Sequence, residues 1–379
     1  MKFDTLLIHN GHECDKTTGA LGVPVFQTST FVQTDVNAGQ EFDYSRSGNP
    51  TRKALEDTIA LLENGAAGYA FGSGMGAIAS VLGIFDTGSH IIVSEDVYGG
   101  TYRILNTFYK RWGLEHTACD TSNIDTIKKA IKSNTKAIFL ETPSNPLLKI
   151  TDLNTALNFA REHDLISIVD NTFMTPLLQR PIELGADIVV HSGTKFLGGH
   201  SDVLSGLAVA RTEKIGKLIY AVQNGFGAIP GPWDVFLVLR GIKTLKTRLE
   251  TSQKSAAVIA AWLCGHKNVD SVYYPGLDSH PGRDTHFKQA AGAGAVLSFK
   301  VKTKEAAAAF FAKISLAAPA VSLGGVETIA SYPVRMSHAG VPVDERERLG
   351  ITDTLIRLSI GLEDAGDLIN DFDCALNQS

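Results

Sequence analysis

Six short apolar runs alternate with helical segments between residues 50 and 230, and this alternation limits the possible folds more than any other feature of the chain. The runs are almost continuously apolar, which is typical of strands buried on both faces of a sheet. Helical segments between such strands predict an α/β sheet covered by helices on both sides. The six runs are Gly68–Phe71, Ile91–Val93, Ala137–Leu140, Ile166–Val169, Ile188–Val190 and Leu207–Ala210.

The sequence before and after this region predicts two further parts. In the first 50 residues glycine and proline interrupt every periodicity, so we expect an extended arm that contributes to a neighbouring subunit. A helix is predicted to begin at Pro50. Beyond Pro230-Gly231-Pro232 we expect a long helix from Trp233 to about Cys264, and then strands near Ala295–Val301 and Leu355–Ile360. The expected parts are an arm of residues 1–50, an α/β domain of residues 51–232 and a smaller α+β domain of residues 233–379.

The composition is that of an ordinary globular protein. The net charge of −5 over 379 residues favours neither nucleic acid nor a membrane surface as a partner. The longest apolar run, Ala256–Cys264, is too short to cross a bilayer, and no secretory signal is expected at the N-terminus. Four cysteines without a C-x-x-C spacing predict free thiols in the cytoplasm. No metal site is expected, because the pair His9 and His12 lacks a third ligand.

Polar residues follow the ends of the apolar runs. Ligands of open α/β sheets bind beyond the carboxyl ends of the strands, so these residues are candidates for a site. They are Gly72-Ser73-Gly74-Met75, Glu95-Asp96-Val97-Tyr98, Glu141-Thr142-Pro143-Ser144-Asn145, Asp170-Asn171 and His191-Ser192-Gly193-Thr194-Lys195.

Lys195 and Asp170 together suggest a carbonyl cofactor. A lysine becomes a nucleophile when its site lowers the pKa of the amine, and it can then form an imine with a carbonyl. An acid at a strand end can pair with the ring nitrogen that pyridoxal 5'-phosphate (PLP) must keep protonated. Taken singly, Lys195 could be a surface lysine and Asp170 a helix cap.

The glycine turn Gly72–Ala77 supports the same cofactor but also an alternative. A glycine turn that opens a helix offers backbone N–H groups and the positive end of the helix dipole to a phosphate. Hydroxyls of Ser192 and Thr194 could add contacts. The turn also fits the dinucleotide fingerprint G-x-G-x-x-A, with Glu95 downstream, so a nicotinamide-dependent oxidoreductase is the alternative; a binding module with an idle Lys195 is a third.

Two further residues are candidates for ring and substrate contacts. Tyr98, before a glycine pair, could stack on a flat cofactor ring or simply pack in the core. Arg357 shares one strand face with Ser359, whereas the apolar residues Ile356 and Leu358 share the other. An arginine in such a strand needs an anion, either a substrate carboxylate or an acid of the protein itself.

Six motifs make the chain resemble the Cys/Met-metabolism PLP enzymes over roughly residues 5–375. That family includes cystathionine γ-lyases, β-lyases and γ-synthases and methionine γ-lyases. The resemblance implies the fold type I (aspartate-aminotransferase-like) architecture, a large mixed-sheet domain with a smaller C-terminal domain, and a homotetramer built from dimers. The motifs are Tyr44–Arg52, Val97–Thr101, Glu141–Pro146, Val169–Phe173, His191–Asp202 and Arg357–Glu363.

The resemblance also implies a role for each residue. Lys195 is the Schiff-base lysine and proton carrier, Asp170 pairs with the pyridine nitrogen, and Tyr98 stacks on the ring as a candidate acid or base. The substrate α-carboxylate is assigned to Arg357, with Asn145 and Ser322 nearby. The phosphate is assigned to Gly74, Met75, Ser192 and Thr194, helped by Tyr44 and Arg46 of the neighbouring subunit.

Three positions bear on the substrate. Arg103 matches the cystathionine enzymes, where it can hold the distal end of the substrate, and Gly100 stands where methionine γ-lyases carry cysteine. Val321 replaces a glutamate of many cystathionine enzymes, which predicts looser substrate choice. We therefore expect a cystathionine γ-lyase that yields L-cysteine, 2-oxobutanoate and ammonia, with some β-elimination and cysteine desulfhydrase activity. Cystathionine β-lyase and methionine γ-lyase are the alternatives within the family.

Overall fold

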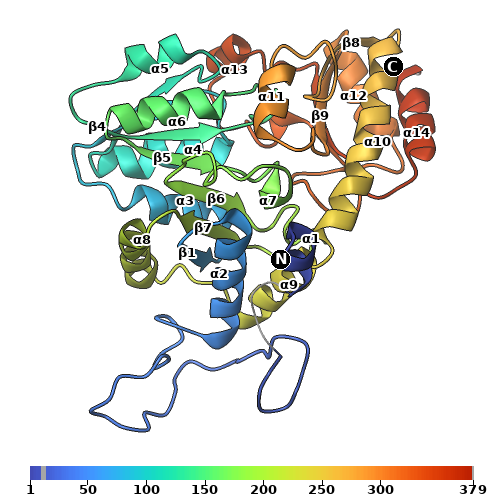
Figure 1. Ribbon diagram of the computed structural model, residues 1–379. Coiled ribbons are helices and arrows are strands. Elements are labelled where there is room, and N and C mark those ends of the chain that lie inside the picture. Colours follow the sequence, from blue (N-terminus) through green and yellow to red (C-terminus); the bar gives the residue numbers. More distant parts are fainter. Residues whose placement is uncertain (10–13, 378–379) are drawn as a thin grey trace.

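The computed structural model describes residues 1–9 and 14–377 (Figure 1). His12, one of the two histidines considered for a metal, lies outside these ranges. Within them, no group of three or more His, Cys, Asp and Glu side chains could hold a metal ion, and no helix is long and apolar enough to cross a membrane.

A mixed sheet of seven strands forms the centre of the larger part of the chain. The strands are β1 (Ala67–Phe71), β2 (His90–Ser94), β3 (Glu115–Cys119), β4 (Thr135–Glu141), β5 (Ile166–Asp170), β6 (Ile188–Ser192) and β7 (Gly206–Ala210). Their order is β1-β7-β6-β5-β4-β2-β3, and β7 is antiparallel to both of its neighbours, whereas the other pairs are parallel. All six apolar runs lie in these strands, as predicted.

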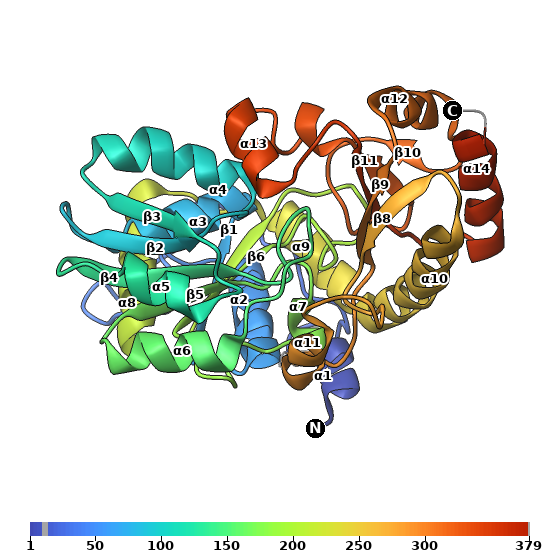
Figure 2. The same ribbon diagram turned by 90° about the horizontal axis from the view of Figure 1, so that it is seen from above.

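Nine helices of the described chain surround or flank this sheet. They are α2 (Pro50–Glu63), α3 (Gly74–Leu82), α4 (Gly99–Ile104), a π-helix (Leu105–Tyr109), α5 (Ile124–Ala130), α6 (Leu153–Glu162), α7 (Thr175–Leu178), α8 (Glu213–Phe226) and α9 (Pro232–Ile242). Successive residues of the central strands enter two separate cores. On β5, Ile168 packs in the core beneath α3 and α8, while Val169 packs in the core beneath α2, α6 and α9. This explains why the runs lack polar alternation, since helices cover both faces (Figure 2).

A second sheet of five strands lies in the C-terminal part. The elements of this part are α10 (Leu245–Gly265), β8 (Val269–Tyr273), α11 (Arg283–Gln289), β9 (Val296–Val301), α12 (Lys304–Lys313), β10 (Ala318–Pro319), β11 (Ile329–Ser331), a 3₁₀ turn (Pro333–Arg335), α13 (Val343–Leu349), β12 (Leu355–Ser359) and α14 (Ala365–Asn377). The strand order is β10-β11-β12-β9-β8. Figure 1 shows this sheet beside the larger one, and α10 runs along its outer side. We keep residues 51–232 and 233–379 as our proposal for the domain limits.

The single long helix expected from Trp233 is wrong. It is two helices, because the chain breaks between Ile242 and Leu245. Arg248 donates to the carbonyl of Gly241 at 2.8 Å, a group that an unbroken helix would use in its own ladder. The same carbonyl also accepts from the Thr244 N–H at 3.1 Å in a tight turn, so the arginine adds a charge-assisted bond at the break.

Two other expectations about local structure need correction. The arm is not wholly extended, since α1 (Phe3–His9) packs Leu7 into the core of the larger part. Between α1 and α2 much of the remaining arm projects away from the body of the chain, as Figure 1 shows in blue. The edge strand β3 is absent from the sequence prediction because its polar sequence, Glu-His-Thr-Ala-Cys, needs only one hydrogen-bonded neighbour.

Candidate active site

A cavity of about 430 Å³ opens beyond the carboxyl ends of β4, β5 and β6. The N-terminus of α3 closes one side, and segments of the C-terminal part close the other. Twelve predicted site residues line it, which is most of the set. They are Gly74, Met75, Tyr98, Arg103, Asn145, Asp170, Ser192, Thr194, Lys195, Val321, Ser322 and Arg357.

Tyr44 and Arg46 do not line this cavity. Arg46 instead donates to the backbone and side-chain oxygens of Asn224 at 2.8 and 3.1 Å, and it lies over the ring of Tyr44. Both residues belong to the arm, which leads away from the cavity of its own chain. The structure of one chain therefore does not bring them to the site, and their predicted role in a neighbouring subunit stays a prediction.

Lys195 follows β6 in a tight turn and reaches the cavity from the large sheet. Its ammonium donates to the Ser322 hydroxyl at 2.6 Å. Burial, helped by the nearby charge of Arg357, lowers the pKa of Lys195 to about 8 from 10.5. About a tenth of this amine is therefore neutral, and so nucleophilic, at pH 7, far more than for an ordinary lysine.

Asp170 ends β5 at the base of the cavity, next to Glu141 on β4. The two residues are paired in the sheet register, and both side chains are buried. Thr172 donates to Asp170 through its backbone N–H at 3.0 Å and its hydroxyl at 2.6 Å. Burial still raises the pKa of Asp170, and burial together with the charge of Asp170 raises that of Glu141 well above its usual range. A cation at this position would stabilise the charged forms of both acids.

The start of α3 forms a close-packed anion cradle. Ser73 caps the helix by accepting from the Gly76 N–H at 3.0 Å, which leaves the amides of the first turn directed at the cavity. A Cβ on Gly74 would lie 2.9 Å from Ser192 Cβ, and one on Gly206 would lie 2.0 Å from the Ser73 carbonyl oxygen. Glycine is required because backbone and hydroxyls approach this closely.

Arg357 lies in the cavity wall with its guanidinium buried. It donates to Asn145 Oδ1 at 2.9 Å, to the Ser322 carbonyl at 2.7 Å and to Ser331 Oγ at 3.0 Å. Within the part of the chain that the structure describes, it forms no ion pair with an acid, and its Nε has no hydrogen-bond partner. Burial lowers the pKa of Arg357 to about 10. A buried cation without a counterion is a binding site for an anion, such as a carboxylate.

A reactive amine, an acid pair that favours a cation, an anion cradle and an unpaired arginine define a PLP-dependent enzyme that acts on an amino acid. Comparison with known proteins leads to the same class. The model of the family described as Cys/Met metabolism PLP-dependent enzyme matches residues 4–377, and the chain belongs to this family.

Individual relatives are similar over nearly their whole length. The chain is 52% identical to the cystathionine beta-lyase MetC of Bacillus subtilis (strain 168) over 375 residues, or 99% of this chain and 96% of the relative. It is 48% identical to a cystathionine gamma-lyase of the same organism, over 99% of both chains. Among solved structures, cystathionine gamma-lyase from Lactobacillus plantarum, complexed with L-serine, superposes with a TM-score of 0.98 at 44% identity, covering 100% of this chain and 99% of the other.

These findings confirm the predicted family, the fold type I class, PLP as cofactor and a PLP-dependent carbon–sulfur lyase as the enzyme class. The relatives of this chain include cystathionine beta-lyases, gamma-lyases and a gamma-synthase, so the comparisons show the group and not one reaction. The nicotinamide alternative is set aside, because the glycine turn belongs to a PLP fold. The cavity itself fits PLP: the start of α3 lines it with Gly74 and Met75, whose amides could bind a phosphate, and Lys195 and the acids Glu141 and Asp170 line the same cavity.

Glu141 is the residue that the sequence analysis underrates. Its place after an apolar run makes it a candidate, but the sequence assigns it no role. In the structure its carboxyl accepts from the Tyr98 backbone N–H at 2.8 Å and lies beside Asp170. Each acid directly follows an apolar run, and the two runs are consecutive in the sequence. This shared position is the signal from which their contact could have been predicted.

The pKa of Lys195 gives a testable pH dependence. We expect the apoenzyme to attach PLP at a rate that rises as the pH passes through about 8 and then levels off, because only the neutral amine attacks a carbonyl. Stopped-flow absorbance of the cofactor measures this rate, with a lysine-containing peptide as the control. A rate that kept climbing to about pH 10, as for an unperturbed lysine, would contradict the assignment.

Proposed function

We propose that this enzyme cleaves a carbon–sulfur bond of L-cystathionine, and that its principal reaction is α,β-elimination, which consumes one water and gives L-homocysteine, pyruvate and ammonia. The observation that carries the proposal is Lys195, the one amine among the described residues that line the cavity, which also contain no histidine. The α,β route requires deprotonation at Cα alone, whereas α,γ-elimination also requires deprotonation at Cβ. The α,β route therefore asks for one proton transfer fewer from Lys195, and the 52% identity to MetC of Bacillus subtilis favours it.

The proposed roles begin with the cofactor. PLP, when bound, supplies the electron sink that makes the Cα proton of an amino acid removable. Asp170 holds the proton on the pyridine nitrogen, and its pairing with Thr172 keeps the carboxylate oriented. Gly74 and Met75 offer their amides to the phosphate, with Ser192 and Thr194. The Thr194 hydroxyl accepts from the Ser205 N–H at 3.0 Å and donates to the Ser205 carbonyl at 3.2 Å, so it must turn from that carbonyl to donate to the phosphate.

The substrate is held at its α-carboxylate and worked on by Lys195. Arg357 and Asn145 bind the carboxylate, which orients the Cα proton toward the lysine. Lys195 removes that proton after its contact with Ser322 breaks. The electron pair left on Cα forms the new Cα–Cβ double bond as the Cβ–sulfur bond breaks. Tyr98 lies at the cavity and is the proposed acid for the departing sulfur.

The outer part of the cavity is proposed to set the breadth of substrate choice. Arg103 lines it and can pair with the distal carboxylate of a long substrate. Val321 lies at the rim with 64% of its surface exposed and offers no partner for the distal ammonium. Shorter thiol-bearing amino acids, such as cysteine, should therefore be accepted with lower efficiency.

The second candidate is α,γ-elimination, which the sequence analysis favours. The similarity to cystathionine gamma-lyases from two organisms supports it. Lys195 would then have to carry a second proton, from Cβ. Methionine γ-lyase remains a further alternative, opposed by Gly100 and Arg103.

Product analysis separates these reactions. We expect purified holoenzyme incubated with L-cystathionine to release pyruvate and homocysteine in excess over 2-oxobutanoate and cysteine. The ratio of pyruvate to 2-oxobutanoate is measured with lactate dehydrogenase and by chromatography of the 2-oxo acids. Chromatography of the thiols gives the ratio of homocysteine to cysteine, and heat-inactivated enzyme is the control. An excess of 2-oxobutanoate would reverse the assignment, and the absence of any 2-oxo acid would reject cystathionine as the substrate.

The arm provides the proposal for assembly. Tyr44 and Arg46 lie outside the cavity of their own chain but carry the residue types suited to a phosphate, so we assign them to the cavity of a neighbouring subunit in a homotetramer. The four cysteines are free thiols, three of them exposed, which supports a cytoplasmic location.

A further inference from the structure

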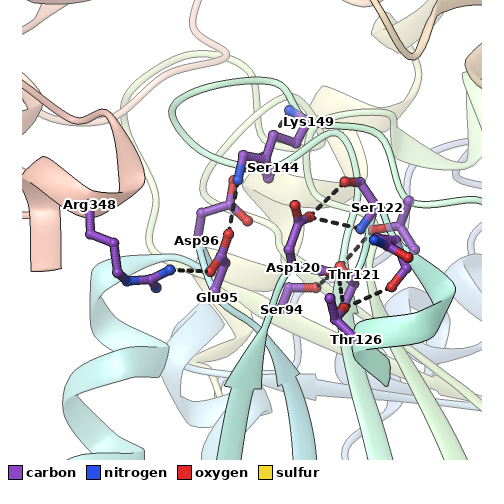
Figure 3. A network of polar contacts seen from close by, with 12 residues as sticks. Ser94, Glu95, Asp96, Asp120, Thr121, Ser122, Thr126, Ser144, Lys149 and Arg348 are labelled. Carbon is purple, nitrogen blue, oxygen red and sulfur yellow. Dashed lines mark hydrogen bonds and ion pairs between the residues drawn. The ribbon is translucent and has the colours of Figure 1, made fainter. Parts of the chain in front are cut away.

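The carboxylate of Glu95, the first residue after β2, joins two parts of the chain that are distant in sequence (Figure 3). One oxygen accepts from Lys149 Nζ at 2.9 Å, and the other accepts from Arg348 Nη1 at 2.9 Å. The Glu95 side chain is only 9% exposed, although both cations reach water. Such a partly buried, two-sided acid is better suited to hold its partners in place than a freely solvated surface pair.

Arg348 lies near the end of α13 and has a second partner on its own helix. Glu345 accepts from its Nε at 3.0 Å and its Nη2 at 2.7 Å, which fixes the guanidinium plane while Nη1 is directed at Glu95. The next residue, Leu349, is buried in a small cluster with Leu147 and Val334. Two consecutive residues of α13 therefore fasten it, one by charge and one by packing.

The two attachment points belong to the loops that carry the cavity residues. Glu95 lies three residues before Tyr98, and Leu147 lies two residues after Asn145. These loops are also joined to each other, since the Ser144 hydroxyl donates to the buried Asp96 carboxylate. The two loops to which α13 is fastened thus form one unit.

The segment that leads into α13 supplies the opposite wall of the cavity. Met336 and Ser337 line the cavity together with Tyr98. The two walls touch, because a Cβ on Gly99 would lie only 2.0 Å from the Ser337 carbonyl oxygen. The position of α13 consequently sets how near this wall lies to Tyr98.

We propose that Arg348 and Glu95 are a positioning pair that clasps α13 to the Tyr98 loop and thereby sets the affinity of the cavity for its substrate. Neither side chain lines the cavity, so the pair acts through Tyr98 and the Met336–Ser337 wall and not by contact with substrate. This inference rests on the substrate cavity assigned under the proposed function. It predicts an effect on KM with little change in kcat, since the reacting groups are untouched.

The test compares Arg348→Gln and Arg348→Lys in the holoenzyme. We expect the glutamine variant to raise KM for L-cystathionine about fivefold, as for loss of one charge-assisted contact at a partly exposed site, with kcat within about twofold. The lysine variant keeps the charge and should recover most of the affinity. Hydrogen exchange, which needs no substrate, should be faster in residues 336–349 of the glutamine variant and unchanged in the large sheet.

Two matched variants separate a clasp from a general loss of structure. Glu345→Gln weakens the contact that orients the guanidinium but leaves the bond to Glu95, so KM should rise clearly less than in Arg348→Gln. Arg283→Gln removes an arginine of similar exposure from α11, which gives no residue to the cavity. An unchanged KM and exchange in Arg348→Gln, or an equal rise in Glu345→Gln, overturns the proposal. If wild-type enzyme does not cleave cystathionine, the proposed function fails, and the exchange result still decides on the clasp.

Discussion

Replacing Lys195 by alanine is expected to lower kcat/KM at least about 10³-fold and to remove covalent attachment of the cofactor, because one residue supplies both the bond to PLP and the base. The cavity offers no substitute, since Lys195 is the one amine among the described lining residues. Borohydride treatment followed by mass spectrometry measures attachment, and steady-state assays measure activity.

An exposed lysine provides the control for this variant. Lys288→Ala on α11 should retain full activity and full cofactor content. Circular dichroism should find both variants folded, since removal of a buried ammonium leaves no unpaired lysine charge in the cavity. Substantial activity in Lys195→Ala, or borohydride labelling at another residue, would reject the assignment.

Arg357→Lys is expected to raise KM for amino-acid substrates on the order of 100-fold, or roughly 2.7 kcal/mol, with cofactor content unchanged. Lysine keeps the positive charge but lacks the planar fork that binds a carboxylate while still donating to Asn145 and Ser331. Initial-rate kinetics over a wide substrate range, beside the absorbance of bound cofactor, measure the two effects.

Arg248→Lys is the matched control, because Arg248 is another buried arginine whose pKa burial lowers to about 10. Its partners are Thr244 and the Gly241 carbonyl, outside the cavity. It should affect thermal stability and leave KM unchanged. If Arg357→Lys altered kcat alone, the arginine would not be the carboxylate site.

Much of the larger domain could be predicted because its central strands are buried on both faces. Each apolar run, such as Ile188–Val190, is too short for a helix and too apolar for a loop, so sequence and burial agree. The edge strand β3 lacks that signal. The break at Lys243-Thr244 also leaves no periodic signal in the sequence, and the contact that accompanies it joins Arg248 to a carbonyl seven residues earlier.

The candidate site was predictable for a related reason. Residues that follow parallel strands meet at one edge of the sheet, so the order of the apolar runs is enough to place Asp170 and Lys195 together. Arg357 comes from the second sheet, and only its apolar neighbours single it out. Contacts that cross the chain, such as Arg348 with Glu95, leave no periodic pattern in the sequence. Tyr44 and Arg46 lie outside the cavity of their own chain, so the phosphate contacts predicted for them require the neighbouring subunit that we propose.

The acid pair Glu141 and Asp170 makes PLP a counterion for folding as well as a reagent. Burial raises the pKa of both acids above their ordinary values of 4.5 and 3.8. The folded chain therefore holds their protons more tightly than the unfolded chain, and the cost of burying the charges grows as the pH rises past the ordinary values and through the raised ones. At neutral pH the folded chain bears this cost, and we expect a bound cofactor whose ring carries a positive charge to lower it. Binding of PLP should therefore also stabilise the folded chain, because it offsets the buried negative charge at the end of the sheet.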